Sequence, residues 1–177
     1  MAVSEDLIIS IDSFRFYTNV EDTVDAELIE PAIILAQDSS EQILGTALKE
    51  KLVTDFNAGT LTGIYSTIHT LLTKWICWTS YKKLLPKIYI RVSNGKLTKG
   101  SSIDSDTIES TELSELLRSC DGDIAVYENK LKAYLSDNQS SITEFDSTVE
   151  WYYKENLEKV DTSQGLTSTP NRRYSDF

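Results

Sequence analysis

The side chains that could support catalysis or bind a metal are one histidine, two cysteines and many carboxylates. His69 is the single histidine of the 177 residues, and it lies in an apolar helical pattern that favours a structural role over a catalytic one. Cys77 and Cys120 also lie in apolar helical patterns, which predicts reduced core thiols, with a disulfide as the alternative. No cysteine and histidine have the spacing of a zinc site.

The carboxylates do not form a recognisable catalytic or calcium-binding motif. Asp104 and Asp106 lack the later glycine and glutamate of a calcium loop, and Asp121-Gly122-Asp123 is expected within a helix. Phosphate-binding loops and nucleophile elbows are also missing from the sequence. We therefore expect a protein that is not an enzyme and has no cofactor. A small enzyme with a polar pocket is one rival hypothesis.

Composition points to a globular protein, because 40% of the residues are hydrophobic and 25% are charged. The acidic first residues do not have the basic region and apolar run of a secretory leader. The most apolar stretch, residues 64–85, contains many polar side chains that a membrane span would leave without partners. We expect a protein that is made in the cytoplasm and has no membrane segment.

Charge is distributed unevenly along the chain, whose formal net charge is −11. Residues 1–70 and 101–160 are strongly acidic, and a body of this kind repels the phosphates of nucleic acids. Residues 71–100 carry no acid, and we call their basic residues the basic block. The basic block either docks on an acidic partner or neutralises the acidic helices of its own chain. It consists of Lys74, Lys82, Lys83, Lys87, Arg91, Lys96 and Lys99.

Hydrophobic spacing predicts a mainly α-helical fold. An extended entry over residues 7–17 precedes a first helix, which begins at Asp22 or Thr23 and ends near Asp38. Pro31 interrupts this helix, so a bend or a restart is expected there.

Two further helices are predicted after the first. Ser39 and Gln42 have the spacing of a capping box, which would start a helix that ends at residues 57–59. The next helix begins near Thr60, is apolar on nearly all sides, and should stop before Pro86. It is predicted to be the buried central helix of the domain.

After the central helix, the spacing of apolar residues changes from a helical to an alternating pattern, which predicts a β-hairpin at about residues 87–99. Apolar and polar residues alternate over residues 88–92, and Asn94-Gly95 suits the tight turn of such a hairpin. A long helix then follows a polar linker, because an unbroken heptad seam runs through seven apolar residues. The seam consists of Leu113, Leu117, Cys120, Ile124, Tyr127, Leu131 and Tyr134.

The chain is interpreted as a helical domain, residues 1–138, followed by a C-terminal arm, residues 139–177. The arm is expected to be loose in the isolated protein and ordered on a partner, because it combines polar residues with aromatic and arginine anchors. The candidate partner-binding residues are the basic block from Lys82 onward and these anchors. The anchors are Trp151, Tyr152, Tyr153, Arg172, Arg173, Tyr174 and Phe177.

Several segments between residues 20 and 138 carry a likeness to a known family. They resemble head-to-tail connector (adaptor) proteins of tailed bacteriophages, in particular the ring proteins of crAss-like phages, in which a helix with an Ala-Gln pair precedes a short Leu-Gly helix. Residues 139–177 match nothing in that group. The similar segments are Ile29–Gln37 with Ala36-Gln37, Ile43–Leu48 with Leu44-Gly45, the Trp/Tyr-rich central helix, Pro86–Val92 and Tyr127–Leu135.

This resemblance implies a non-enzymatic structural protein of the virion. It implies a helical-bundle adaptor domain with a small β element, of which twelve copies form a ring beneath the portal protein. The ring would contact other neck and tail ring proteins and continue the DNA channel, through which DNA passes without specific binding. The alternative is an acidic intracellular regulator or DNA mimic, which would be a monomer or dimer with no affinity for virion parts.

Overall fold

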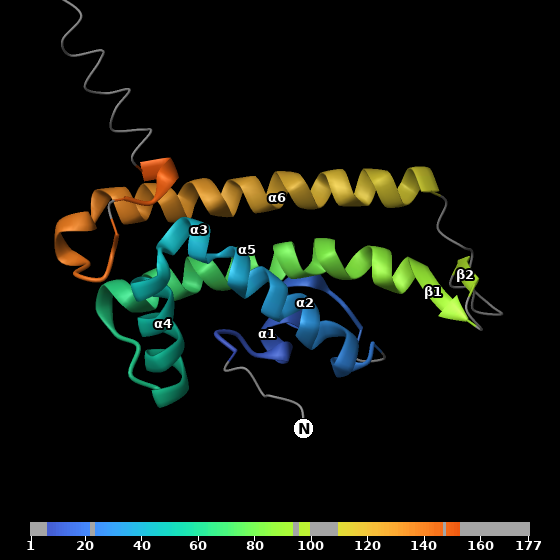
Figure 1. Cartoon of the computed structure of the whole chain (residues 1–177), viewed down its shortest axis with the longest axis horizontal. Coiled ribbons are helices and arrows are strands. Elements are labelled where there is room, and N and C mark those ends of the chain that lie inside the picture. Colours follow the sequence, from blue (N-terminus) through green and yellow to red (C-terminus); the bar gives the residue numbers. More distant parts are fainter. Residues whose placement is uncertain (1–6, 22–23, 94–95, 100–109, 147, 153–177) are drawn as a thin grey trace, which may run out of the picture.

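The computed structural model describes most of the chain between residues 7 and 152. The fold is mainly α-helical, as predicted (Figure 1). For residues 89–93, 96–99 and 110 the backbone alone is described. The described ranges are residues 7–21, 24–93, 96–99, 110–146 and 148–152.

Helix α5, Gly63–Tyr89, is the centre of the fold. Helices α1 (Ile11–Thr18) and α2 (Ala26–Ser39) pack on α5, and α6 (Ser110–Asp137) packs along its other side (Figure 1). The buried residues of α5 face both layers, which confirms the predicted central helix. The apolar ones are Ile68, Leu72, Trp75, Ile76, Cys77, Leu84 and Leu85, and the polar ones are Thr73, Thr79 and Ser80.

The predicted end of α5 before Pro86 is wrong, because the helix continues through Pro86 to Tyr89. A proline inside a helix removes one backbone hydrogen bond. Leu84 and Leu85 just before it are buried, however, and Ile88 just after it packs against the core. Apolar contacts on both sides of the proline therefore outweigh the missing bond.

Residues 11–18 form a helix, which corrects the predicted extended entry. The Ser10 hydroxyl caps α1 by accepting a hydrogen bond from the backbone N–H of Ser13 at 3.1 Å, and Asn19 ends the helix with a φ of 53°. Helix α1 buries Phe14 against the core. The Ser10 cap and the burial of Phe14 stabilise this helix. The short pattern of apolar residues in the sequence did not predict it.

Helix α2 is a single helix that runs through Pro31, so the predicted alternative of a restart is wrong. Ile29 and Ile33, on either side of Pro31, are both fully buried against the core, while Pro31 itself is exposed. The buried side holds the helix together, and the proline lies on the solvent side.

The predicted capping box at Ser39 is also wrong. Ser39 is the last residue of α2, and its hydroxyl donates to the carbonyl of Leu35 at 2.7 Å.

A short helix α3 (Glu41–Leu44) is separated from α4 (Thr46–Ala58) by Gly45, whose φ of +76° favours glycine. A Cβ at Gly45 would lie 3.3 Å from Asp146 Cβ, so close packing also requires glycine there. The predicted end of α4 at Gly59 is confirmed by its φ of +67°.

Two short strands follow α5. Strand β1 (Ile90–Ser93) pairs antiparallel with β2 (Lys96–Lys99), with Ile90 opposite Lys99 and Ser93 opposite Lys96. The turn residues Asn94 and Gly95 lie outside the described residues. Figure 1 shows these strands at one end of α5, beside the start of α6, and we call this the strand end.

The predicted boundary after residue 138 is wrong, because residues 139–152 pack on the helical body. After α6 and a short 3-10 helix (Gln139–Ser141), Ile142 and Phe145 are 3% and 8% exposed and belong to the hydrophobic core. Figure 1 shows this segment with α4 at the end opposite the strands, and we call it the closed end. Residues 139–152 therefore belong to the helical body.

Candidate functional site

His69 has a structural role, as predicted. Its Nε2 lies 2.7 Å from the carbonyl oxygen of Ile8, which can only accept, so Nε2 carries the donating hydrogen. The ring stacks on Phe56 with centroids 4.7 Å apart, and burial lowers the pKa of the imidazole. Gln37 accepts a hydrogen bond from the N–H of Ile8 at 2.8 Å. Both polar groups of the Ile8 peptide are thus held by side chains of α2 and α5.

Both cysteines are buried thiols. Burial raises the pKa of the Cys77 thiol to about 12 and also raises the pKa of Cys120. Since the thiolate is the nucleophile and the metal ligand, the raised pKa values disfavour both roles for these side chains. Within the described ranges, His, Cys, Asp and Glu side chains form no cluster of three or more that could hold a metal ion.

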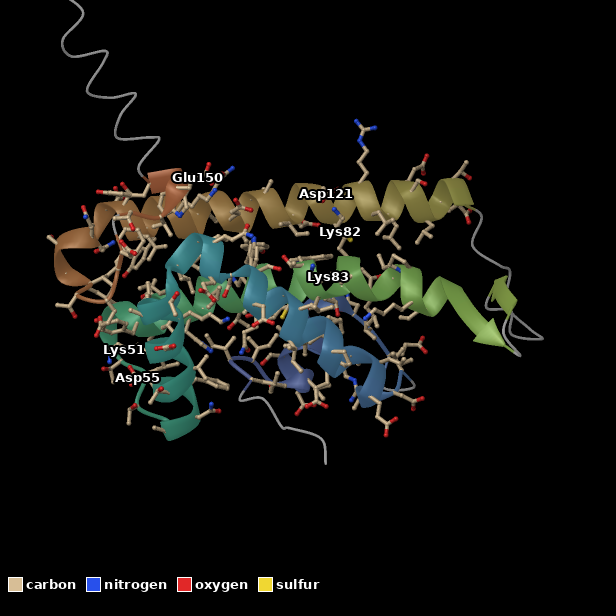
Figure 2. All side chains as sticks on the ribbon, in the orientation of Figure 1. Lys51, Asp55, Lys82, Lys83, Asp121 and Glu150 are labelled. Carbon is tan, nitrogen blue, oxygen red and sulfur yellow. The ribbon has the colours of Figure 1, made fainter. Side chains whose placement is uncertain are left out.

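Part of the basic block contacts the chain's own residues. Lys74 lies over the rings of Tyr17 and Tyr127, at 5.8 and 5.7 Å from their centroids. Figure 2 shows Lys82 beside Asp121, with which it forms an ion pair between α5 and α6. For Lys82 the structure supports the alternative in which the basic block neutralises its own acidic helices, whereas Lys74 lies over neutral aromatic rings.

The other members of the basic block lie toward the strand end. Lys83 is half-buried on α5, and Lys87 is exposed near the C-terminal end of that helix. Arg91 lies in β1, and Lys96 and Lys99 lie in β2, but their side chains are outside the described part of the molecule.

Trp151 and Tyr152 contribute to the body of the protein, whereas the sequence assigned them to an arm. The indole N–H of Trp151 donates to the carbonyl of Ile43 at 3.0 Å, and the hydroxyl of Tyr152 donates to Gln139 at 2.5 Å. The Tyr152 ring also meets Phe145 edge to face at 5.4 Å. The remaining predicted anchors lie outside the described residues: Tyr153, Arg172, Arg173, Tyr174 and Phe177.

A polar cluster fixes the closed end to α4 and α5. The hydroxyl of Tyr65 donates to the Glu144 carboxylate at 2.5 Å, and this bond lowers the pKa of Glu144 and raises the pKa of Tyr65. Lys51 lies 4.9 Å from the centroid of the Tyr65 ring and pairs with Asp55 at 3.1 Å; Figure 2 shows this pair on α4. These contacts account for the cluster as a structural link, in which Lys51 and Asp55 have the i, i+4 spacing of a helix and Tyr65 and Glu144 are far apart in the sequence.

A pocket of about 340 Å³ lies between α2, α3, α5, α6 and the C-terminal turn. One of its sides carries the ion pair between Lys132 and Glu128 at 2.7 Å, and Lys132 also lies 5.5 Å from the Trp151 ring centroid. Two indole rings and several charged groups suit a large side chain of a partner. No sequence pattern indicates this pocket, because its residues are far apart along the chain. They are Ser39, Gln42, Ile43, Trp75, Glu128, Lys132, Glu150 and Trp151.

Among the described residues, four large apolar side chains are exposed, and no sequence pattern indicated them. Phe16 on α1 is 77% exposed, and Leu28 and Leu35 on α2 are 45% and 48% exposed. Val126 on α6 is 49% exposed. In the described ranges, none of the helices is long and apolar enough to cross a membrane.

Comparison with known proteins gives a family but no characterised relative. No curated protein and no solved structure matches the chain. A family model described as "Family of unknown function (DUF6712)" matches residues 40–150, which is more than half of the chain. The match runs from the end of α2 to the turn that closes the pocket, so it includes the segment beyond residue 138 that packs on the body. The chain therefore belongs to the DUF6712 family.

Proposed function

We propose that this protein is a structural subunit of the neck of a tailed bacteriophage, where copies form a ring between the portal and the tail. The ring docks on the portal protein or on an adjoining ring and continues the DNA channel. The resemblance of residues 20–138 to connector proteins suggests this role. The observation that carries it is the placement of candidate contact elements at opposite ends of a helix pair.

Helices α5 and α6 have 27 and 28 residues and pack side by side. At about 1.5 Å per residue, each is about 40 Å long. Figure 1 places β1 and β2 at one end of this pair and residues 139–152 at the other. An adaptor has to contact a different layer on each side, and a rod with separate contact elements at its two ends meets this requirement. A protein that binds one partner at one site does not need such an arrangement.

Charge supports the same proposal. With a net charge of −11, the protein as a whole repels DNA, so packaged DNA would slide past it. The exposed Lys87 and the strand residues Arg91, Lys96 and Lys99 bring basic residues to the strand end, where the neighbouring start of α6 carries the exposed Glu112 and Glu115. We assign the strand end to the contact with an acidic surface of the adjoining layer.

The C-terminal residues provide the test of this function. Deleting residues 161–177 should leave the thermal unfolding midpoint of the purified protein nearly unchanged, because every core residue of the described part precedes residue 153. The same deletion should abolish incorporation into phage particles, measured by immunoblotting of purified virions. A matched control carries the same 17 residues in scrambled order, which keeps length and composition and should also fail.

A truncated chain that still enters infectious particles would contradict the assigned role of these residues. A full-length chain that is missing from purified virions, and that does not bind the portal protein in native mass spectrometry, would contradict the proposed function itself. A monomer or dimer that binds a basic host protein would then favour the acidic-regulator hypothesis.

A further inference from the structure

The pocket at the closed end contains a buried hydrogen-bond donor without an acceptor. Trp75 lines this pocket of about 340 Å³, and its side chain is 5% exposed. The indole N–H of Trp75 has no hydrogen-bond partner within the described part of the chain. Buried donors in folded proteins are nearly always bonded, because a donor without an acceptor costs free energy. We therefore expect a group bound in the pocket to supply an acceptor oxygen to this N–H.

The second indole of the pocket already has its hydrogen bond. Trp151 donates from its indole N–H to the carbonyl of Ile43 at 3.0 Å, which holds the ring beside α3. Trp151 follows α6, whereas Trp75 lies in α5, so the two rings reach the pocket from different parts of the fold. The pocket thus combines two apolar ring systems with a donor on Trp75 that is left to bind something else.

The charged groups of the pocket do not select a charged ligand. Lys132 and Glu128 pair with each other at 2.7 Å on α6, and Lys132 also lies 5.5 Å from the ring centroid of Trp151. A cation in the pocket would compete with Lys132 for this ring and carboxylate, and an anion would compete with Glu128 for Lys132. Figure 2 shows Glu150 on the turn that follows α6, where it is exposed and solvent screens its charge. An uncharged ligand disturbs none of these contacts.

These features define the chemical class of the ligand. Aromatic and aliphatic side chains pack well against indole rings, and the buried Ile43 adds a further apolar surface. Every residue of a protein chain also carries a carbonyl that accepts hydrogen bonds. A protein segment with a large apolar side chain therefore supplies both the apolar group and the acceptor. The pocket volume of about 340 Å³ lies within the range of known ligand sites.

We propose that this pocket binds an uncharged segment of another neck protein. A large apolar side chain of that segment lies at the two indole rings, and a carbonyl oxygen of the segment accepts the hydrogen bond of Trp75. This inference deepens the proposed function, on which it rests for the identity of the partner. It assigns the closed end to the layer on the other side of the ring, opposite the layer at the strand end.

A titration followed by NMR tests the pocket on the full-length protein. The chain has three tryptophans and gives three indole N–H signals, which the Trp75→Phe, Trp78→Phe and Trp151→Phe variants assign. The probe is N-acetyl-L-phenylalaninamide, which carries an aromatic ring and two carbonyls and has no charge. Adding it should move the Trp75 signal downfield and to saturation, because the proton enters a hydrogen bond. The signal of Trp78, which does not line the pocket, should stay in place.

Two charged analogues of the probe test the ligand class. Phenethylammonium carries a positive charge and no carbonyl, and hydrocinnamate carries a negative charge. Each should bind at least about tenfold more weakly than the neutral probe, because it leaves the Trp75 donor unpaired or breaks the Lys132 pair. Equal or tighter binding of either analogue would overturn the uncharged class. A Trp75 signal that the neutral probe does not move would overturn the proposal as a whole, since a water molecule would then be the only acceptor.

A single substitution tests the hydrogen bond itself. Trp75→Phe keeps most of the aromatic surface and removes the donor, so the affinity for the neutral probe should fall about three- to tenfold. The Trp151 signal reports the binding in this variant. Trp78→Phe on the same helix is the matched control and should bind the probe as the unaltered protein does. Unchanged affinity in Trp75→Phe would contradict the assigned bond, and the titration of the unaltered protein decides the question if this variant does not fold.

A substitution at the rim of the pocket separates this inference from the proposed function. Gln42→Trp, at an exposed lining position, should block the pocket and abolish both probe binding and incorporation into phage particles. Ala47→Trp, at an exposed position on α4, is the control and should keep both. Probe binding by a protein that is missing from virions would support the ligand class and refute the virion role. Normal incorporation of a Gln42→Trp variant that no longer binds the probe would refute the contact and leave the virion role intact.

Discussion

The two halves of α6 have the same heptad pattern but different surroundings. In the C-terminal half, the seam residue Leu131 and the nearby Leu135 are fully buried in the hydrophobic core. In the N-terminal half, the seam residues Leu113 and Leu117 are only partly buried, and Cys120 is the buried exception. The first pair lies at the closed end, where residues 139–152 and α3 add a further layer, and the second pair lies toward the strand end.

This difference shows what a heptad pattern specifies. The pattern fixes which side of α6 faces α5, because apolar residues at a spacing of three and four share one side of a helix. It does not fix how deeply each position is buried, since that depends on which other segments cover the helix. The closed end is therefore expected to carry most of the stability, and the strand end is left available for contacts.

The largest expected effect comes from shortening a seam residue at the closed end. Leu131→Ala should lower the free energy of unfolding by about 2–5 kcal/mol, because it leaves a cavity in the core. The same change at Leu117 should cost markedly less, since its side chain already contacts water. Urea denaturation followed by circular dichroism measures both. Equal losses at the two positions would mean that the two halves of α6 are equally buried in solution.

The next prediction concerns the segment that covers the closed end. Trp151→Phe keeps most of the ring but removes the indole N–H that donates to the carbonyl of Ile43. We expect a loss of about 0.5–1.5 kcal/mol in the free energy of unfolding. Tyr152→Phe, which removes the hydroxyl bonded to Gln139, is the companion variant. If neither change alters the urea midpoint, residues 150–152 do not close the body as described.

A pH dependence is expected from His69, which joins the N-terminal segment to α5. Burial lowers its pKa below the ordinary value of 6.5, so the unfolded chain binds a proton more readily than the folded one. Stability should therefore fall as the pH decreases through 6.5 and continue to fall until the lower folded pKa is reached. Thermal unfolding between pH 7.5 and 5.5 measures this slope. His69→Gln should be less stable overall but should flatten the slope, and an unchanged slope would assign it to other groups.

The smallest effect is expected at the ion pair that joins α5 to the N-terminal half of α6. The side chains of Lys82 and Asp121 are 38% and 56% exposed, so solvent screens their attraction. A double-mutant cycle with Lys82→Ala and Asp121→Ala should give a coupling free energy of about 0.2–1 kcal/mol. Added salt should reduce the coupling. A larger value would show that this half of the helix pair is less accessible to water than the structure indicates.

Some features of the fold were set by local sequence. The buried central helix and the long α6 followed from apolar periodicity, and Gly59 marked the end of α4 because positive φ is accessible to glycine. The paired strands lie within the range where alternation and Asn94-Gly95 predicted a hairpin. These patterns involve residues that are close together along the chain, so the sequence alone is enough to predict the elements that they form.

Other features were decided by contacts between distant residues. Helices α2 and α5 continue through Pro31 and Pro86 because apolar side chains on both sides of each proline are held by other helices. The segment after residue 138 joins the body because Ile142 and Phe145 find an uncovered part of the core, which no local pattern reveals. The pocket, the hydrogen bonds of His69 and Gln37 with the Ile8 peptide, and the exposed apolar residues of α2 and α6 arise in the same way. Burial is a property of the whole assembly of helices, so only the tertiary structure could determine which apolar residues are covered and which remain for a partner.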